Sequence, residues 1–290
     1  MAGQSHDLAA REETPSVQTP TRSVVITGAT GGLGTATVQR LAGAGWQVFA
    51  ADIDSPALHS LASERIVPLP VDVTDGACVD ALRNRVAAHT SALAGVVNFA
   101  GVLEVGPLVE LDEAAFRRVL DVNVVGTFLV MKALFPLVRA GHGRLVLISS
   151  ETGWQTAMPF NGPYAMSKHA VEAYGDALRR ELMLLGIPVI KIQPGAFRTG
   201  MVAGAAGRFE KLAANSVDFG KQLAKATNWL PREERRAKDP AELASLIERA
   251  LTERRWRAAY SINANPASSM LTRLPSRVVD RLLLLALRRD

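Results

Sequence analysis

Cysteine is almost absent from the sequence: Cys78 is the only one in 290 residues. A single cysteine excludes an internal disulfide framework and a zinc site built from cysteines, and it fits a reducing compartment. The sequence also has no zinc-finger spacing, no aromatic RNA-binding signature and no dense basic run. A nucleic-acid-binding role is therefore not supported, and we expect no metal site.

Long hydrophobic runs are missing as well. Residues 1–21 contain Pro15 and Pro20 but no apolar stretch, so we interpret them as a disordered tail rather than a signal peptide or a membrane span. The Leu-rich stretch within "RLPSRVVDRLLLLALRRD" is far too short to cross a bilayer. We therefore expect a cytoplasmic protein.

Positive charge is in excess only near the C-terminus. The net charge is +5, and residues 230–290 contain thirteen Lys or Arg and eight Asp or Glu, which accounts for all of the excess. The arginines alternate with acidic residues, as in "PREERRAKDPAELASLIERALTERR". This pattern is typical of a solvated helix face rather than of a surface that binds nucleic acid.

Short β-rich runs alternate with longer helical patterns along the chain. The strand candidates are Ser23–Gly28, Gln47–Asp52, Ile66–Asp72, Gly95–Gly101, Arg144–Ser150, Pro188–Gly195 and Ala258–Ile262. The helical patterns are Gly34–Gly43, Asp75–His89, Glu113–Val138 and Ala165–Leu185. The alternation predicts one α/β domain with a Rossmann-type, doubly wound parallel sheet of about seven strands and helices on both faces. Ligands of such sheets bind at the edge where the strands end.

A glycine-rich loop, "TGATGGLG", directly follows the first predicted strand and opens a helix. Gly28, Gly32 and Gly34 permit a tight turn and let the backbone approach a pyrophosphate. The free N–H groups at the start of the helix would bind that pyrophosphate. In this context the loop predicts a dinucleotide site rather than a plain turn.

Asp52 ends the second predicted strand, where a carboxylate can accept both ribose hydroxyls of an adenosine. The same carboxylate would repel a 2′-phosphate. No Arg or Lys lies in the glycine loop or just after Asp52 to neutralise that phosphate. The sequence therefore predicts NAD(H) rather than NADP(H) as the cofactor. A strand-end cap is the alternative interpretation of Asp52.

Tyr164 and Lys168 lie four residues apart, on one face of a predicted amphipathic helix. A phenol is a poor base at neutral pH, but a nearby cation favours the phenolate and lowers the phenol's pKa. The two residues could thus form a tuned acid/base pair. Taken alone, such a pair is more often two ordinary surface residues, so the rest of the chain has to decide.

Six motifs occur in order along the chain: "TGATGGLG", "NFAG" (98–101), "DVNVVG" (121–126), "ISSETG" (148–153), "YAMSK" (164–168) and "PGAFRT" (194–199). Together they resemble the standard single-domain form of the short-chain dehydrogenases/reductases. "PFNGPYAMSK" and the Leu-rich end look most like the steroid- and retinol-dehydrogenase branch. The resemblance implies a catalytic domain over 22–262, with a substrate lid at about 200–230, and a helical extension over 263–290.

The resemblance assigns a catalytic role to four residues. Tyr164 would exchange a proton with the substrate oxygen, and Lys168 would hold the nicotinamide ribose and tune the tyrosine. Asn123 would complete a water-linked proton relay. Ser150 would hydrogen-bond the substrate oxygen; it lies one residue farther from Tyr164 than is usual in the family, and Ser149 is the alternative.

The resemblance also implies a set of cofactor-binding residues spread over six segments. They are Thr27, Gly28, Thr30, Gly31, Gly32, Leu33 and Gly34; Asp52 and Ile53; Asp72 and Val73; Asn98, Ala100 and Gly101; Tyr164 and Lys168; and Pro194, Gly195, Phe197 and Thr199. Phe99 stands where the family more often has asparagine, which removes one amide and its hydrogen bonds.

The reaction implied by the resemblance is hydride transfer between a nicotinamide and a hydrophobic secondary alcohol or ketone that is steroid-, retinol- or lipid-like. Relatives pair through two long helices, so we expect a homodimer or homotetramer. For the Leu-rich C-terminus, pocket closure or subunit packing is favoured over contact with a membrane surface. A catalytically silent NAD(H)-binding sensor and a member similar to sugar-nucleotide epimerases are the alternatives.

Overall fold

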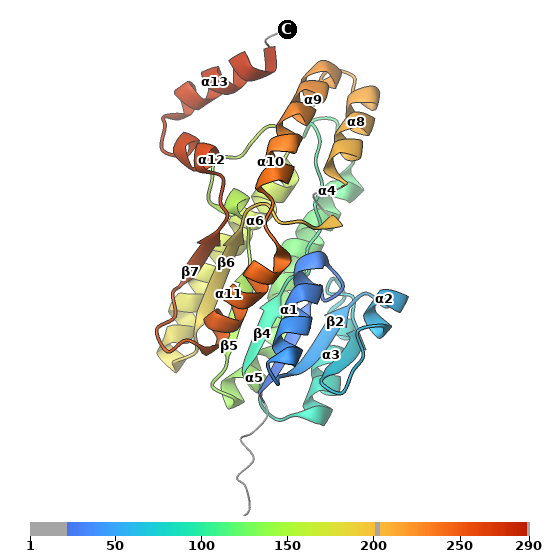
Figure 1. Ribbon diagram of the computed structural model, residues 1–290, viewed down its shortest axis with the longest axis vertical. Coiled ribbons are helices and arrows are strands. Elements are labelled where there is room, and N and C mark those ends of the chain that lie inside the picture. The colour runs from blue at the N-terminus through green and yellow to red at the C-terminus, as the bar shows by residue number, and fades with distance from the viewer. Residues whose placement is uncertain (1–21, 201–203, 289–290) are drawn as a thin grey trace, which may run out of the picture.

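The computed structural model describes residues 22–200 and 204–288, and the tail predicted over 1–21 lies outside the described residues. One parallel sheet of seven strands, ordered β3-β2-β1-β4-β5-β6-β7, forms the centre of the molecule (Figure 1). The chain builds the sheet outward from β1 on one side and from β4 on the other, so β1 and β4 meet at a switch point where ligands of such sheets bind. The strands are β1 (Ser23–Thr27), β2 (Gln47–Asp52), β3 (Ile66–Pro70), β4 (Gly95–Asn98), β5 (Arg144–Ile148), β6 (Val189–Pro194) and β7 (Ala259–Ile262).

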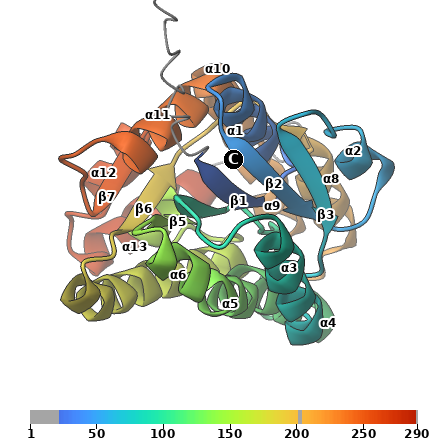
Figure 2. The ribbon, with the colours of Figure 1, turned by 90° about the horizontal axis from the view of Figure 1, so that it is seen from below.

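Helices cover both faces of the sheet (Figure 2). One face carries α1 (Gly32–Gly43) and α11 (Pro240–Thr252), which pack against each other. The other face carries α3 (Gly76–His89), α5 (Gly126–Ala140) and α6 (Gly162–Leu182). The predicted doubly wound α/β fold is confirmed.

Two apolar cores form because successive side chains of a strand point to opposite faces of the sheet. Val24 and Ile26 belong to the core under α1 and α11, whereas Val25 belongs to the core under α3, α5 and α6. All three side chains are fully buried. Burial on both faces explains why the strands are nearly all apolar.

The predicted helix over residues 113–138 is interrupted in its middle. It consists of α4 (Glu113–Leu120), a π-helical turn (Asp121–Val125) and α5, which ends at Ala140. Such turns are common at functional sites, and this one carries Asn123. By length and composition the whole stretch Glu113–Ala140 could cross a membrane, but the inner side of α5 packs on the sheet. In the described fold it is a core helix.

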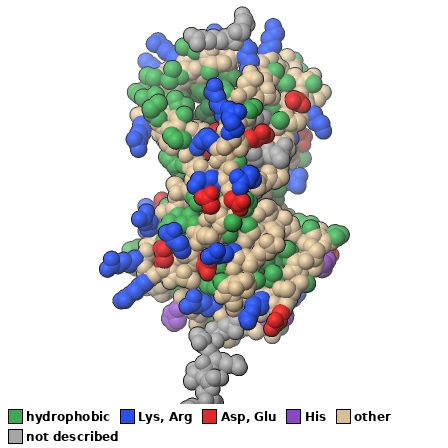
Figure 3. Space-filling view, viewed as in Figure 1, with side chains coloured by type: hydrophobic (Ala, Val, Ile, Leu, Met, Phe, Trp, Pro, Cys, Tyr) green, Lys and Arg blue, Asp and Glu red, His purple; other side chains and the backbone are tan. Residues whose placement is uncertain are grey.

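A second group of helices extends beyond the ends of the strands, and Figure 3 shows many hydrophobic side chains on its surface. Few of its side chains are buried: α8 and α12 bury none, and α13 buries only Val279. Residues 201–203, at the start of the predicted lid, lie outside the described residues. The group consists of α8 (Ala205–Asn215), α9 (Gly220–Ala226), η4 (Thr227–Trp229) and α10 (Leu230–Arg236) after β6, and α12 (Pro266–Leu271) and α13 (Ser276–Arg288) after β7. The remaining short elements are α2 (Pro56–His59), η2 (Glu151–Gly153) and η3 (Met183–Leu185).

Candidate active site

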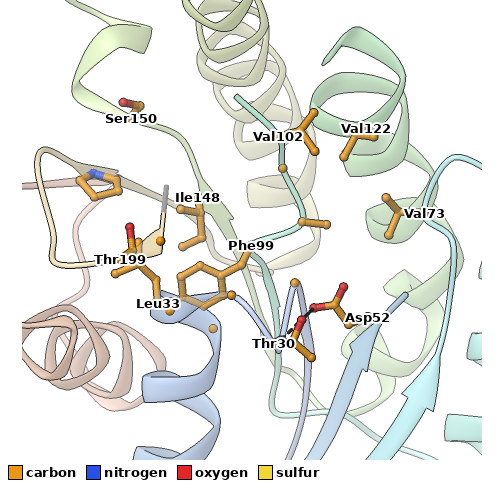
Figure 4. Close-up of a pocket in the computed structure, with 18 of the residues that line it drawn as sticks. Thr30, Leu33, Asp52, Val73, Phe99, Val102, Val122, Ile148, Ser150 and Thr199 are labelled. Atoms are coloured by element: carbon orange, nitrogen blue, oxygen red, sulfur yellow. Dashed lines mark hydrogen bonds between the residues drawn. The ribbon is translucent and has the colours of Figure 1, made fainter. Parts of the chain in front are cut away.

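A cavity of about 780 Å³ opens at the edge where the strands end. Figure 4 shows Thr30 and Asp52 at one end of it and Ser150 at the other, with Leu33 and Phe99 between them. This arrangement suits an extended ligand with polar groups at both ends. All of the predicted site residues line the cavity except Thr27, Asn98 and Asn123.

The glycine loop is packed so closely that side chains would not fit. Gly28 has a φ of +64°, and a Cβ there would lie 2.8 Å from the backbone nitrogen of Ala100. A Cβ on Gly34 would overlap the carbonyl oxygen of Gly28. No described side chain caps the first turn of α1, which begins beside Gly31. Free N–H groups and the positive end of the helix dipole therefore lie at the cavity wall, as pyrophosphate binding requires.

Asp52 accepts three hydrogen bonds at the end of β2. The backbone N and the Oγ1 of Thr30 donate to its Oδ2 at 2.8 and 2.6 Å, and Ile53 N donates to its Oδ1 at 2.8 Å (Figure 4). These bonds hold the carboxylate at the cavity wall. A carboxylate has about four acceptor sites, so capacity remains for a ribose hydroxyl.

Arg118, which sequence reasoning missed, also lines the cavity. It comes from α4, far along the chain from the glycine loop and Asp52. Arg118 and Lys168 are the two basic residues among the described residues of the lining. The cavity therefore contains a second cation that inspection of the glycine loop and its surroundings could not reveal.

Thr27 and Asn98 belong to a hydrogen-bond chain behind the cavity rather than to its wall. Thr27 Oγ1 donates to Asn98 Oδ1 at 2.5 Å, and Asn98 Nδ2 donates to Thr127 Oγ1 at 2.9 Å. Thr127 Oγ1 donates in turn to the carbonyl oxygen of Asn123 at 2.7 Å. The chain joins β1, β4 and the π-helical turn, so the two predicted cofactor residues position the site from behind.

Asn123 is buried and anchors the loop that follows β4. Its Oδ1 accepts from Val102 N at 2.8 Å, and its Nδ2 donates to Val102 O and Ser167 Oγ, both at 2.9 Å. A Cβ on Gly101 would lie 3.3 Å from Asn123 Oδ1 and 3.7 Å from Lys168 Nζ, so both atoms lie beside this glycine. Asn123 thus lies next to Lys168, and its role in a proton relay stays a prediction.

Ser150 and Tyr164 meet inside the cavity, where their side chains are hydrogen-bonded. Ser150 Oγ also accepts from Thr152 N at 3.2 Å. Ser149 Oγ is buried and has no hydrogen-bond partner among the described residues. It lies against Gly153, where a Cβ would come within 2.7 Å of it. Ser150, rather than the alternative Ser149, is therefore the serine in contact with Tyr164.

Lys168 lies over the ring of Tyr164, with its Nζ 5.6 Å from the ring centroid, and donates to Ile148 O at 2.9 Å. Burial lowers the pKa of Lys168 to about 8, against the opposing effect of Glu172. Burial likewise raises the pKa of Tyr164 to about 12; the bond with Ser150 opposes this rise and the charge of Glu151 adds to it. Burial thus outweighs the neighbouring groups at Tyr164, and tuning of the phenol by Lys168 together with the nicotinamide stays a prediction.

Glu151, directly after Ser150, forms a network that sequence reasoning also missed. Its Oε2 accepts from the backbone N of Asn265 and lies 3.4 Å from Gln155 Nε2. Asn265 Nδ2 donates to Glu233 Oε1 at 2.6 Å, and Arg236 pairs with the same carboxylate at 3.3 Å. Burial raises the pKa of Glu151. The network joins the loop after β5 to α10 and α12, segments that no sequence pattern connects.

Comparison with known proteins agrees with this geometry. The family model described as short chain dehydrogenase matches residues 22–207. The chain belongs to the short-chain dehydrogenase family. Retinol dehydrogenase 16 of Mus musculus is 33% identical over 282 residues, which cover 90% of this chain and 87% of that protein. The 11-beta-hydroxysteroid dehydrogenase type 2 of Homo sapiens is 36% identical over 199 residues, or 66% of this chain and 49% of that protein.

Solved structures of relatives include both cofactor types. A short-chain dehydrogenase/reductase from Burkholderia phymatum in complex with NAD has a TM-score of 0.74 and 27% identity, over 90% of this chain and 95% of that one. An actinorhodin polyketide ketoreductase with NADPH has a TM-score of 0.72 and 26% identity, over 84% and 96% of the two chains. The protein is thus a short-chain dehydrogenase/ketoreductase, similar to the steroid and retinol branch.

Proposed function

We propose that the enzyme interconverts hydrophobic secondary alcohols and ketones with NAD(H), and that Tyr164 is the general acid/base. The observation that carries this proposal is the cluster of Ser150, Tyr164 and Lys168 at one end of the cavity, with Asp52 at the other. NAD⁺, when bound, accepts the hydride and adds positive charge near the phenol. The hydrophobic substrate class is supported by the likeness to retinol and hydroxysteroid dehydrogenases.

The residues present fit a dinucleotide along the whole cavity. The N-terminus of α1 would bind the pyrophosphate, because Gly31 and its neighbours leave the N–H groups free. Asp52 would accept an adenosine ribose hydroxyl, and Lys168 would hold the other ribose. Thr199 lines the cavity beside Leu33 and would bind the carboxamide (Figure 4).

Ser150 and Tyr164 would hold the substrate oxygen between two hydroxyl groups. In ketone reduction Tyr164 donates its proton to that oxygen as the carbonyl carbon gains hydride, and in alcohol oxidation the phenolate takes the proton back. Because burial raises the pKa of Tyr164 to about 12, the phenol is protonated at neutral pH, which is the form that donates. Asn123 and Lys168 would return the proton from solvent.

A turnover screen tests the proposal. The full chain is mixed with NAD⁺ or NADP⁺ and a panel of steroid, retinoid and long-chain secondary alcohols, and the reduced cofactor is followed by absorbance. We expect turnover of hydrophobic alcohols, faster with NAD⁺ than with NADP⁺. NADH binding with no turnover of any alcohol or ketone would instead identify a silent sensor, and conversion of sugar nucleotides would identify an epimerase.

We also propose that the enzyme forms a homodimer or homotetramer. Three apolar residues are exposed on the two long helical segments: Val125 in the π-helical turn before α5, Phe128 in α5 and Met166 in α6. Exposed apolar residues grouped on helix faces are typical of subunit interfaces. Light scattering at micromolar concentration should give a mass at least twice the 31.0 kDa of one chain.

A further inference from the structure

α13 is held to the rest of the molecule along only one of its faces. Val279 is buried, and Leu283 and Leu287, four and eight residues later, are half-buried on the same face. The helix packs against α9. This inner strip accounts for three of the apolar residues of α13, and the others need a different explanation.

A second apolar strip of α13 is exposed. Val278, Leu282 and Leu285 are 43%, 45% and 56% exposed, and their spacing of four and three residues puts them on one helix face. Met270 and Leu274, just before the helix, are exposed as well. Figure 3 shows hydrophobic side chains gathered at this end of the molecule, with Lys and Arg side chains beside them.

Arginines border the exposed strip. Arg277, Arg281 and Arg288 have spacings of four and seven residues, which place them on the face next to Val278, Leu282 and Leu285. They and Arg273 are exposed, and none of the four forms an ion pair within the described part of the chain. Asp280 is the one acidic residue of α13.

We propose that this C-terminal face, the exposed strip of α13 with its bordering arginines, binds the surface of an anionic lipid bilayer. The 13 residues of α13 span about 20 Å, less than the roughly 30 Å of a hydrocarbon core. The helix therefore lies in the plane of the membrane, with its leucines at the headgroup boundary. The long arginine side chains reach the lipid phosphates from beside them.

Charge distinguishes a bilayer from a second copy of the chain as the occupant. Two copies joined through this face would bring their arginines together, with only Asp280 of each α13 to compensate. Anionic headgroups neutralise the same arginines. The sequence favoured subunit packing or pocket closure for this segment, but the exposure of Leu282 and Leu285 removes pocket closure as their role.

The segment that precedes α13 is fixed to the loop that follows Ser150 of the cavity lining. Gln155 Nε2 donates to Ser269 Oγ at 2.9 Å, and Thr156 N donates to Thr272 Oγ1 at 2.9 Å. These bonds tie α12 and its C-terminal cap to the loop after Ser150. Docking would place this side of the cavity near lipid, from which an apolar substrate could enter; only this last step rests on the proposed function.

Vesicle flotation of the full chain tests the proposal without substrate or cofactor. The probes are vesicles of phosphatidylcholine alone and vesicles with about one third phosphatidylglycerol. We expect flotation with the anionic vesicles, and at least about tenfold weaker binding to the neutral ones. No flotation with either vesicle overturns the proposal.

Two double variants separate insertion from charge. Leu282→Gln with Leu285→Gln removes apolar contact without changing charge, and Arg277→Gln with Arg281→Gln removes charge; each should weaken anionic-vesicle binding by about tenfold or more. The matched control is Leu184→Gln with Leu185→Gln. These exposed leucines lie in η3, just before the start of β6, and this variant should bind vesicles as the unmodified chain does.

Two results would overturn the assignment even if the protein floats. Loss of binding in the arginine variant alone would mean general electrostatic attraction with no inserted strip. A fall in solution mass for the Leu282 and Leu285 variant, with unchanged vesicle binding, would mean that a second copy covers the face. Circular dichroism and melting temperature verify that every variant is folded.

Discussion

In α5, Val130, Met131 and Leu134 pack against the sheet and are at most 1% exposed, whereas α8 and α12 bury no residue and α13 buries one. The helices on the sheet are therefore positioned by a shared apolar core, which tolerates little change in volume. The helices beyond the strands bury fewer side chains, chiefly Leu223 and Ala226 of α9 and Val279 of α13, and polar links such as the one from Gln155 to Ser269 add to these contacts. We therefore expect the cofactor end of the cavity to belong to the more rigid part of the molecule, and its other end to border a part that opens at lower free energy.

The largest effect should come from the rigid part, at Tyr164. Tyr164→Phe removes the proton path but keeps the ring over which Lys168 lies. Turnover should fall by at least about a thousandfold while NADH affinity changes little, as single-turnover kinetics and NADH titration would show. Lys168→Ala should reduce both turnover and NADH affinity. A phenylalanine variant with more than about a tenth of normal turnover would mean that the pair is structural.

The stability of the two parts can be compared directly with matched truncations. Leu134→Ala, in the core under α5, should lower the free energy of unfolding by about 2–5 kcal/mol, because it leaves a cavity. Leu212→Ala, at a half-buried position of α8, should cost less than about 1 kcal/mol. Denaturant unfolding measures both. Equal losses of unfolding free energy in the two variants would contradict the contrast between the helices on the sheet and those beyond the strands.

Cofactor choice should depend on the charges at the two sides of the cavity. Asp52→Ala should narrow the ratio of NADPH to NADH dissociation constants by about tenfold, because it removes a negative charge beside the ribose. Arg118→Ala is the control of opposite charge, and it should weaken NADPH more than NADH. Fluorescence titration measures the NADH and NADPH dissociation constants of the unmodified enzyme and of both variants. NADPH binding as tightly as NADH to the unmodified enzyme would refute the role of Asp52.

The smallest effect tests the link between the two parts at Glu151. Its negative charge raises the pKa of Tyr164, so Glu151→Gln should lower that pKa and move the rise of the oxidation rate to lower pH, by less than about one unit. Glutamine keeps an acceptor for the backbone N of Asn265. Glu233 belongs to the same network but does not contribute to the pKa shift of Tyr164, so Glu233→Gln should leave the pH profile of oxidation unchanged. If the rise of the oxidation rate moved to higher pH in the Glu151 variant, the negative charge of Glu151 would not be what raises the pKa of Tyr164.

Local patterns made part of the site predictable. The glycine loop, Asp52 and the pair of Tyr164 and Lys168 each depend on a strand end or a helix face, which hydrophobic periodicity locates from the sequence. The choice of Ser150 over Ser149 came from motif alignment, and the hydrogen bond to Tyr164 supports it. The sign of the pKa shift of Tyr164 was not predictable in the same way, because it depends on how deeply the whole fold buries the phenol.

By itself, the sequence determined the alternation of strands and helices, the family and the edge of the sheet at which the cofactor loops meet. Only the tertiary structure decided that Asn123 is held by Val102 and Ser167, that Arg118 reaches the cavity, and that Glu151 meets Asn265. It also decided which leucines of α13 face solvent. The physical reason is that a periodic pattern shows which side of a helix is apolar, whereas what covers that side depends on contacts between segments far apart in the chain.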